Sequence, residues 1–190
     1  MGTGVVCERG PSRAASRTLT VVRIGVLSAV AFLLMYLETN LPLFPAFLQY
    51  DAGEVPALIG GFAMGPLAGA AVVVGKCFLF LVSGKDEAGW LGTAANLLLG
   101  MAMVLVAAFV YLRQRTRRGA LLGLAAGVAA GTAVMAAANY WFFLPTYGIP
   151  REALGSTLKV VVLFNLVKGI LSSTLTFLLY KRVRPLLSPK

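Results

Sequence analysis

Five polar side chains stand inside long apolar stretches of this sequence: Lys76, Asn96, Asn139, Asn165 and Lys168. A charged group in hydrocarbon costs about 2.5–3.5 kcal/mol on insertion scales, so each of these side chains needs a partner, a cavity or a function. Asn165 and Lys168 are three residues apart and therefore lie on one face of a helix. Amides donate and accept hydrogen bonds, whereas an ammonium group only donates, so carbonyl and hydroxyl groups of a ligand are possible partners.

The depths of these five side chains agree. Counted from the outer end of its own predicted helix at about 1.5 Å per residue, each falls roughly 7–18 Å deep. We therefore expect them to share one site in the outer half of a membrane. Structural hydrogen bonds between helices are the alternative, because they could produce the same arrangement. No acidic residue is expected beside the two lysines, whose partners would be amide oxygens, backbone carbonyls or ligand groups.

Aromatic side chains fall near the same depth: Tyr140, Trp141, Phe142, Phe143, Phe78 and Phe80. They would suit a flat aromatic ligand, because small-molecule pockets are mostly apolar with a few fixed polar groups. Aromatic residues also gather at membrane interfaces without any ligand, so a plain aromatic belt is the alternative interpretation.

Enzyme chemistry finds little support in the sequence. It contains no histidine, no Cys/His metal spacing and no G-x-x-x-x-G-K-[ST] phosphate loop. Cys7 and Cys77 provide no disulfide framework. Glu38, Asp51 and Glu54 flank one loop and could serve a membrane enzyme that acts on lipid head groups, but no nucleophile or metal-ligand set accompanies them. We therefore expect no catalysis and no cofactor, and interpret the carboxylates as helix-end, loop or ligand contacts.

The elements that must position these residues are transmembrane helices. The chain is 58% hydrophobic and 13% charged, against roughly 45–50% and about 25% in soluble domains. Its apolar runs predict an all-α, six-helix membrane bundle with helices near residues 19–37, 54–64, 67–83, 90–112, 120–144 and 156–180. The second helix is too short to span a bilayer without tilt or thinning. One transmembrane domain, 19–184, would lie between a cytoplasmic tail, 1–18, and a short carboxyl-terminal tail, 185–190.

The loop after the first helix is predicted to be structured. Pro42 and Pro45 prevent that helix from continuing. Residues 41–53 are too apolar for an ordinary solvated loop, because they include Phe44, Phe47, Leu48 and Tyr50. A lid over a pocket and interfacial anchoring by aromatic residues both account for this composition.

The basic residues predict the orientation. Twelve of the seventeen cationic residues fall in three clusters, near the amino terminus, between residues 113 and 118, and after residue 180. Six spans place all three clusters on one face, and cationic loops stay on the cytoplasmic side. Both termini are therefore predicted to be cytoplasmic. The net charge of +10 is a topology signal rather than a sign of nucleic-acid binding.

Small residues recur every fourth position in two of the helices, which lets helix backbones approach closely in lipid. The longer series is Gly119, Gly123, Gly127 and Gly131. We expect that series to pack inside the bundle, with a partner-binding surface as the alternative. A shorter pair in the first helix is Gly25 and Ala29.

Several runs of the sequence together resemble the riboflavin-specific S components of energy-coupling factor (ECF) transporters. They are residues 41–51 (LPLFPAFLQYD), 54–60 (EVPALIG), 65–69 (GPLAG), 139–140 (NY), 144–148 (LPTYG) and 164–171 (FNLVKGIL). Each short run is unspecific, but the combination is specific and covers the chain from the first helix to the sixth.

This resemblance implies a multi-pass protein of a prokaryotic cell membrane that binds riboflavin in a pocket open to the outside, gated by the loop after the first helix. A membrane-spanning coupling protein and two cytoplasmic ATPases would supply energy, and the whole subunit would topple to release its vitamin. In this family a small-xxx-small face of the first helix contacts the coupling protein. The matching positions here are Gly25 and Ala29, with glycine in place of the usual alanine.

The resemblance also implies ligand contacts. Asn139, Asn165 and Lys168 would meet the pyrimidine edge of the isoalloxazine, which offers two carbonyls and an N–H group. Residues expected to cover the ring are Leu43, Phe44, Tyr50 and Trp141, and those expected near the ribityl hydroxyls are Lys76, Asp51 and Asn96. The alternatives are an S component for thiamin, biotin or folate, a lipid-modifying membrane enzyme and a purely structural subunit. Binding of flavin mononucleotide (FMN) is left open.

Overall fold

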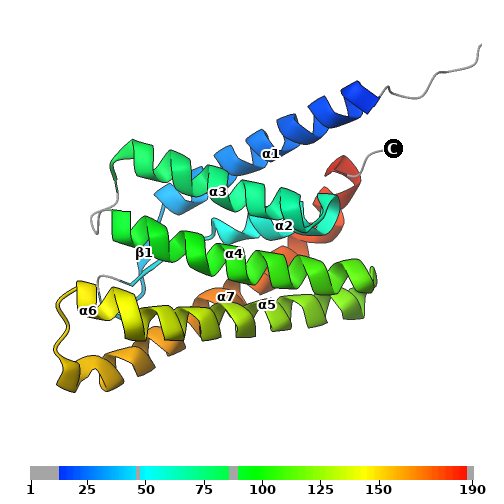
Figure 1. Ribbon diagram of the computed structural model, residues 1–190. Coiled ribbons are helices and arrows are strands. Elements are labelled where there is room, and N and C mark those ends of the chain that lie inside the picture. The colour runs from blue at the N-terminus through cyan, green and yellow to red at the C-terminus, as the bar shows by residue number, and fades with distance from the viewer. Residues whose placement is uncertain (1–12, 46–47, 86–89, 188–190) are drawn as a thin grey trace, which may run out of the picture.

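Residues 13–45, 48–85 and 90–187 are described by the computed structural model of the chain, which is almost entirely helical (Figure 1). Its helices are α1 (Arg13–Tyr36), α2 (Glu54–Met64), α3 (Pro66–Ser83), α4 (Trp90–Arg113), α5 (Arg117–Ala138), the π-helical turn η1 (Asn139–Phe143), α6 (Leu144–Thr146) and α7 (Arg151–Leu187). Two short strands, β1 (Thr39–Asn40) and β2 (Gln49–Tyr50), pair antiparallel, with Thr39 opposite Tyr50.

Within the described ranges, five helical stretches are long and apolar enough to cross a membrane: Arg17–Tyr36, Pro66–Ser83, Trp90–Arg113, Arg117–Thr146 and Arg151–Tyr180. These stretches confirm the prediction of an all-α membrane bundle. α2 is shorter, and its 11 residues are only about 16 Å long at 1.5 Å per residue.

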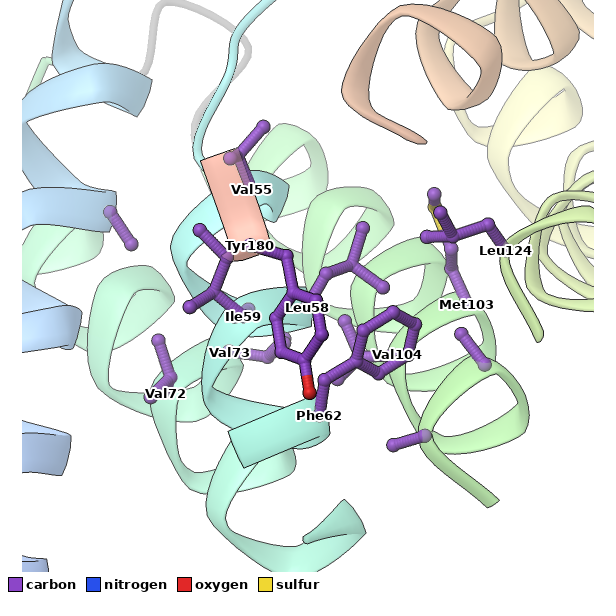
Figure 2. Close-up of a cluster of buried hydrophobic side chains, with 14 of the residues drawn as sticks. Val55, Leu58, Ile59, Phe62, Val72, Val73, Met103, Val104, Leu124 and Tyr180 are labelled. Carbon is purple, nitrogen blue, oxygen red and sulfur yellow. The ribbon is translucent and has the colours of Figure 1, made fainter. Parts of the chain in front are cut away.

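The short helix α2 lies at the centre of the bundle. It contacts α1, α3, α4 and α7, and residues 54–62 of this helix are all buried. Figure 2 shows Val55, Leu58, Ile59 and Phe62 of α2 surrounded by apolar side chains from α3, α4, α5 and α7. α2 is therefore the core around which the longer helices pack.

Three helices begin three or more residues earlier than the sequence predicts, and α7 also continues to Leu187, into the predicted carboxyl-terminal tail, rather than ending near residue 180. α1 begins at Arg13 rather than at residue 19, because residues 13–18 contain neither proline nor glycine to stop a helix. α5 begins at Arg117, where the Thr116 hydroxyl accepts a hydrogen bond from the Gly119 amide as an N-cap. α7 begins at Arg151, directly after Pro150, a residue tolerated at a helix start because its missing N–H would be unpaired there anyway. Residues 1–12 and 188–190 of the predicted tails lie outside the described residues.

The glycine series of α5 packs against α4, as predicted. All four glycines are buried. A Cβ atom added at Gly123 would lie 2.6 Å from the carbonyl oxygen of Ala107, and one at Gly127 would lie 2.6 Å from that of Met103. These distances are too short for any side chain, so glycine is what allows the backbones of α4 and α5 to approach. Gly25 on α1, by contrast, faces open space.

Candidate functional site

The structure contains a cavity of about 410 Å³. Its lining residues belong to the end of the bundle that carries the β1–β2 pair and α6, two elements whose positions Figure 1 shows. Its walls come from the loop after α1, the end of α3, the start of α4, the α5–η1 junction and α7. The lining residues are Glu38, Leu48, Gln49, Phe80, Gly92, Ala95, Asn96, Leu99, Met135, Asn139, Phe143, Tyr147, Val161, Phe164, Asn165 and Lys168. Its size falls within the range of about 300–1,000 Å³ typical of small-molecule sites, and its mostly apolar wall with few polar groups is equally typical.

Two asparagine amides are held in fixed orientations on this wall. The Asn139 side-chain Nδ2 donates to the carbonyl oxygen of Met135 at 2.8 Å, and the Asn165 Nδ2 donates to that of Val161 at 3.0 Å. Each bond reaches back one helical turn and uses one of the two amide donors. The acceptor oxygen and the second donor of each amide are thus left for a ligand.

The π-helical turn η1 contributes two side chains to the cavity. The Leu144 amide donates to the carbonyl of Asn139, five residues earlier, which is the π-type bond that often occurs at functional sites. Asn139 and Phe143 are both buried and line the cavity. Tyr140, Trp141 and Phe142 are 45%, 79% and 48% exposed and point away from the core, as an aromatic belt would. The structure thus does not bring Trp141 to the cavity.

Lys168 on α7 is the cation of this site. Its Nζ donates to Asp51 Oδ2 at 2.6 Å and to Asn96 Oδ1 at 2.8 Å, which leaves one of its three donors available. Asp51 precedes α2 and also accepts a hydrogen bond from the Gly53 amide at 2.8 Å. Burial alone would raise the pKa of Asp51, but the positive charges of Lys168 and Lys76 outweigh it and lower that pKa below its ordinary value.

The second buried lysine is not part of the cavity. Lys76 on α3 is fully buried, and its Nζ donates to Glu54 Oε1 at 2.6 Å. It does not line the cavity, although its depth matches that of the other four polar residues. Within the described part of the chain, Glu54 Oε2 has no hydrogen-bond partner. Lys76 thus forms a buried ion pair with Glu54 between α2 and α3, and its charge also acts on Asp51.

The prediction that no acidic residue lies beside the two lysines is wrong. Asp51 and Glu54 are 2% and 0% exposed and pair with Lys168 and Lys76. Both carboxylates belong to the segment around the start of α2, which enters the centre of the bundle instead of remaining at its surface. A buried cation needs a counter-charge, and this inward course of the chain supplies it.

The loop after α1 covers part of the cavity. Phe44 packs edge-on against Phe164 with ring centroids 5.3 Å apart, and Leu48 lies on the cavity wall itself. Tyr50 is half-buried in β2, whereas Leu43 is 90% exposed. The loop therefore contributes side chains to the wall, but Leu43 is turned away from it.

Sequence reasoning missed several cavity residues. Glu38 was interpreted together with Asp51 and Glu54 as a helix-end, loop or ligand contact and was not assigned to the site, and Gln49 was named only as part of the run 41–51. With its nitrogen facing Glu38, the Gln49 amide donates to both carboxylate oxygens at 3.0 and 3.1 Å. The only signal in the sequence was the position of both residues at the ends of an unusually apolar loop.

The geometry does not favour a lipid-modifying enzyme. Two of the three carboxylates considered for it, Asp51 and Glu54, are buried in ion pairs rather than exposed to lipid head groups. Among the described residues, no group of three or more His, Cys, Asp or Glu side chains could hold a metal ion.

A comparison with known families agrees with a binding site of this kind. The family model of the substrate-specific component of ECF transporters matches residues 19–180. The chain belongs to this family. With its five long apolar helices, this S component is a multi-pass protein of the bacterial cell membrane and a transporter subunit rather than an enzyme.

Known relatives of this S component include two riboflavin transporters. It is 33% identical to the riboflavin transporter RibU of Staphylococcus aureus (strain TCH60) over 171 residues, which cover 86% of this chain and 89% of the relative. It is also 33% identical to the riboflavin transporter FmnP of Bacillus subtilis (strain 168) over 174 residues, which cover 87% of this chain and 92% of the relative. These matches confirm the resemblance seen in the sequence.

Solved structures show the same fold. An S component of a bacterial ECF transporter superposes with a TM-score of 0.80 at 30% identity, covering 91% of this chain and 99% of the solved one. ThiT from Listeria monocytogenes superposes with a TM-score of 0.65 at 16% identity, and the match covers 92% of this chain and 100% of the solved one. At that identity the second match shows a shared fold alone.

Proposed function

We propose that this S component binds riboflavin and mediates its uptake. The observation that carries the proposal is the convergence of Asn139, Asn165 and Lys168 on one cavity of about 410 Å³. Two free amide oxygens, their remaining N–H groups and one free ammonium donor match a pyrimidine edge with two carbonyls and one N–H. The riboflavin transporters that share 33% identity with the chain support the same ligand.

The apolar part of the cavity suits the three-ring portion of a flavin. Phe80, Leu99, Met135, Phe143 and Phe164 line it, and aromatic side chains contribute large contact areas to flat ligands. Phe44 and Tyr50 of the loop would complete the cover over the ring. Asn96 would face the ribityl chain, while Asp51 would act through Lys168 rather than by direct contact.

The proposed topology has six helical segments with both termini in the cytoplasm and the cavity facing outward. The cationic loop between α4 and α5 then lies on the inner side, with Arg113, Arg115, Arg117 and Arg118, in agreement with the positive-inside rule. The cavity lies at the opposite end of α4, near Gly92 and Asn96. A cysteine placed at exposed Trp90 should react with an impermeant thiol reagent in intact cells, and one at Arg115 should not.

The energy for uptake would come from a coupling membrane protein and two cytoplasmic ATPases. The exposed face of α1 would meet the coupling protein. Gly25 and Ala29 are both exposed on this helix, and only 17% of its spanning window is buried inside the chain. That exposure leaves a long apolar surface for a partner helix or for lipid.

Binding measurements on the purified, detergent-solubilised protein test the proposal. Riboflavin should bind tightly with quenching of its fluorescence, and protein isolated from cells should carry flavin absorbance. Asn139→Ala and Asn165→Ala should each weaken riboflavin binding roughly 5- to 150-fold, because each deletion leaves a buried polar ligand group without its partner, at about 1–3 kcal/mol. Trp141→Ala, on the exposed face, is the matched control. Indifference of the wild-type protein to riboflavin would refute the proposal, and tight thiamin, biotin or folate binding would then identify the alternative.

A further inference from the structure

A second cavity, of about 570 Å³, is lined by two arginines, Arg23 and Arg115, and is called the basic cavity below. Its walls come from the first half of α1, the end of α2 with the turn into α3, and the end of α4. Because α4 reaches the first cavity at Gly92 and the basic cavity at Leu112, the two cavities lie at opposite ends of the bundle. Figure 1 shows the connection from α4 to α5 at the end of the bundle away from β1.

The charged groups of the basic cavity are all positive. Among the described residues that line it there is no aspartate or glutamate. Both ion pairs found within the described ranges involve lysines of the bundle core, so neither Arg23 nor Arg115 is held in one. The tail 1–12 contains one glutamate and one arginine, so the composition of this segment supplies no net negative charge. The basic cavity therefore suits an anion from outside the chain.

The position of Arg23 along its helix points to a membrane anion. Arg23 is half-buried and lies within the apolar spanning stretch Arg17–Tyr36. Six residues, or about 9 Å of helix, separate it from the first residue of that stretch. A cation at this depth needs a negative partner or must extend to the membrane interface. Lipid phosphates lie at that interface, outside the hydrocarbon core.

The surface beside the basic cavity is apolar and exposed. Val22 and Val26, on either side of Arg23 in α1, are 55% and 58% exposed, and their spacing of four residues places them on one face of the helix. Leu67, in the first turn of α3, is 84% exposed. Leu112, which lines the cavity itself, is 42% exposed. A ligand that joins a negative head to apolar chains would contact both the arginines and these side chains, whereas an inorganic anion would use only the arginines.

We propose that the basic cavity binds an anionic phospholipid: Arg23 and Arg115 contact the phosphate of its head group, and its acyl chains lie along the exposed apolar side chains beside the cavity. The planar guanidinium group suits this role because it donates two parallel hydrogen bonds to a phosphate. A zwitterionic lipid fits less well, because no described carboxylate of the cavity would meet its ammonium group. Basic pockets between transmembrane helices on the cytoplasmic side are a known type of lipid site, and the proposed topology places the basic cavity on that side.

The test measures phospholipid binding to the purified full-length chain in detergent by native mass spectrometry. Phosphatidylglycerol and phosphatidylethanolamine with identical dioleoyl chains are compared, so that only the head group differs. The variant combines Arg23→Gln with Arg115→Gln. The matched control combines Arg117→Gln with Arg118→Gln, which removes the same charge from two exposed arginines at the start of α5 that do not line the cavity.

We expect the wild-type chain to prefer phosphatidylglycerol. An arginine close to an anionic lipid contributes about fivefold in affinity, so the cavity variant should bind phosphatidylglycerol roughly 30-fold more weakly. The control should stay within about threefold of wild type, because charges outside the site act through solvent and are screened. Equal affinity of the wild-type chain for the two lipids, or equal losses in the two paired variants, would overturn the proposal. Displacement of phosphatidylglycerol by an equal concentration of inorganic phosphate would also overturn it, because the ligand would then be a free anion.

A second measurement uses the wild-type chain alone and decides the matter if the cavity variant does not fold. Phosphatidylglycerol with a photoreactive head group should cross-link to residues 20–23, 61–66 and 108–115, which include the lining of the basic cavity. Cross-links confined to other segments would place the lipid elsewhere and refute the site. Riboflavin is absent from both measurements. A chain that binds riboflavin without preferring the anionic lipid overturns this site alone, and one that prefers the anionic lipid without binding riboflavin overturns the proposed function alone.

Discussion

Replacing both Lys76 and Glu54 by apolar side chains should restore the thermal stability that is lost when only one of them is replaced. Lys76→Met leaves the carboxylate of Glu54 buried without a counter-charge, and Glu54→Leu leaves the ammonium in the same position. Breaking a buried pair in this way typically costs about 3–5 kcal/mol, whereas replacing both partners is often neutral or stabilising. The pair is suited to this test because both side chains are at most 1% exposed.

The expected change in melting temperature follows from this free-energy cost. At roughly 2–4 °C per kcal/mol for a chain of this size, each single variant should lower the melting temperature by about 6–20 °C. The double variant should recover most of this loss, because Leu and Met fill similar volumes and remove the unpartnered Glu54 Oε2. The assay is gel filtration of detergent-solubilised protein after heating over a temperature series.

Riboflavin binding by the double variant tells whether Lys76 has any role at the ligand. We expect the affinity to stay within about threefold of wild type, a change below roughly 0.7 kcal/mol, because Lys76 does not line the cavity. A folded double variant that has lost riboflavin binding would refute this reasoning and support direct contact of Lys76 with the ribityl chain. A double variant as unstable as the single ones would show that the two charges are not a self-contained pair.

Three further outcomes are expected. Gly127→Ala should lower the melting temperature strongly, because the new Cβ would lie 2.6 Å from a carbonyl oxygen of α4. Gly25→Ala is the control for the same heating series and should not lower the melting temperature, because its Cβ would meet no atom within 4 Å. The pKa of Asp51 is lowered in the folded chain, so the stability from its pair with Lys168 is present above the ordinary aspartate pKa of about 3.9 and lost as pH falls through the lower folded value. The stability difference between wild type and Asp51→Asn should thus stay constant from about pH 8 to about pH 5. Trp141→Ala should leave the thermal stability in detergent nearly unchanged, because this side chain is 79% exposed and exposed substitutions usually change stability by only about 0.5 kcal/mol.

Depth along the helices was enough to predict that four polar side chains lie together on the wall of one cavity. Asn96, Asn139, Asn165 and Lys168 share one cavity, as their common distance from the outer helix ends indicated. Lys76 shows the limit of that argument. A count of residues fixes the height of a side chain in the membrane, but not the direction in which it points around the helix axis.

The counter-charges could not be predicted from the sequence. Asp51 and Glu54 follow a proline-rich loop and begin a short helix, a position that is normally at a membrane surface. Only the packing of α2 between four longer helices shows that this segment turns inward. The contribution of Glu38 and Gln49 to the cavity depends on the same fold of the loop.

The π-helical turn was also beyond sequence reasoning. A regular helix was expected to run to residue 144, whereas one wider turn begins at Asn139. Asn139 and Phe143 of this turn line the cavity, whereas Trp141 between them is 79% exposed, as their spacing of four and two residues would also give in an ordinary helix. No residue type in the segment is diagnostic of such a turn.

The central position of α2 has a consequence for how the protein is made. A helix about 16 Å long that begins with Glu54 is a poor substrate for insertion by itself, since it is too short for the bilayer and carries a charge. Among the residues that the structure describes, the cation paired with this carboxylate is Lys76 on the next helix. We therefore expect α2 and α3 to insert into the membrane together as one hairpin, joined at Gly65 and Pro66.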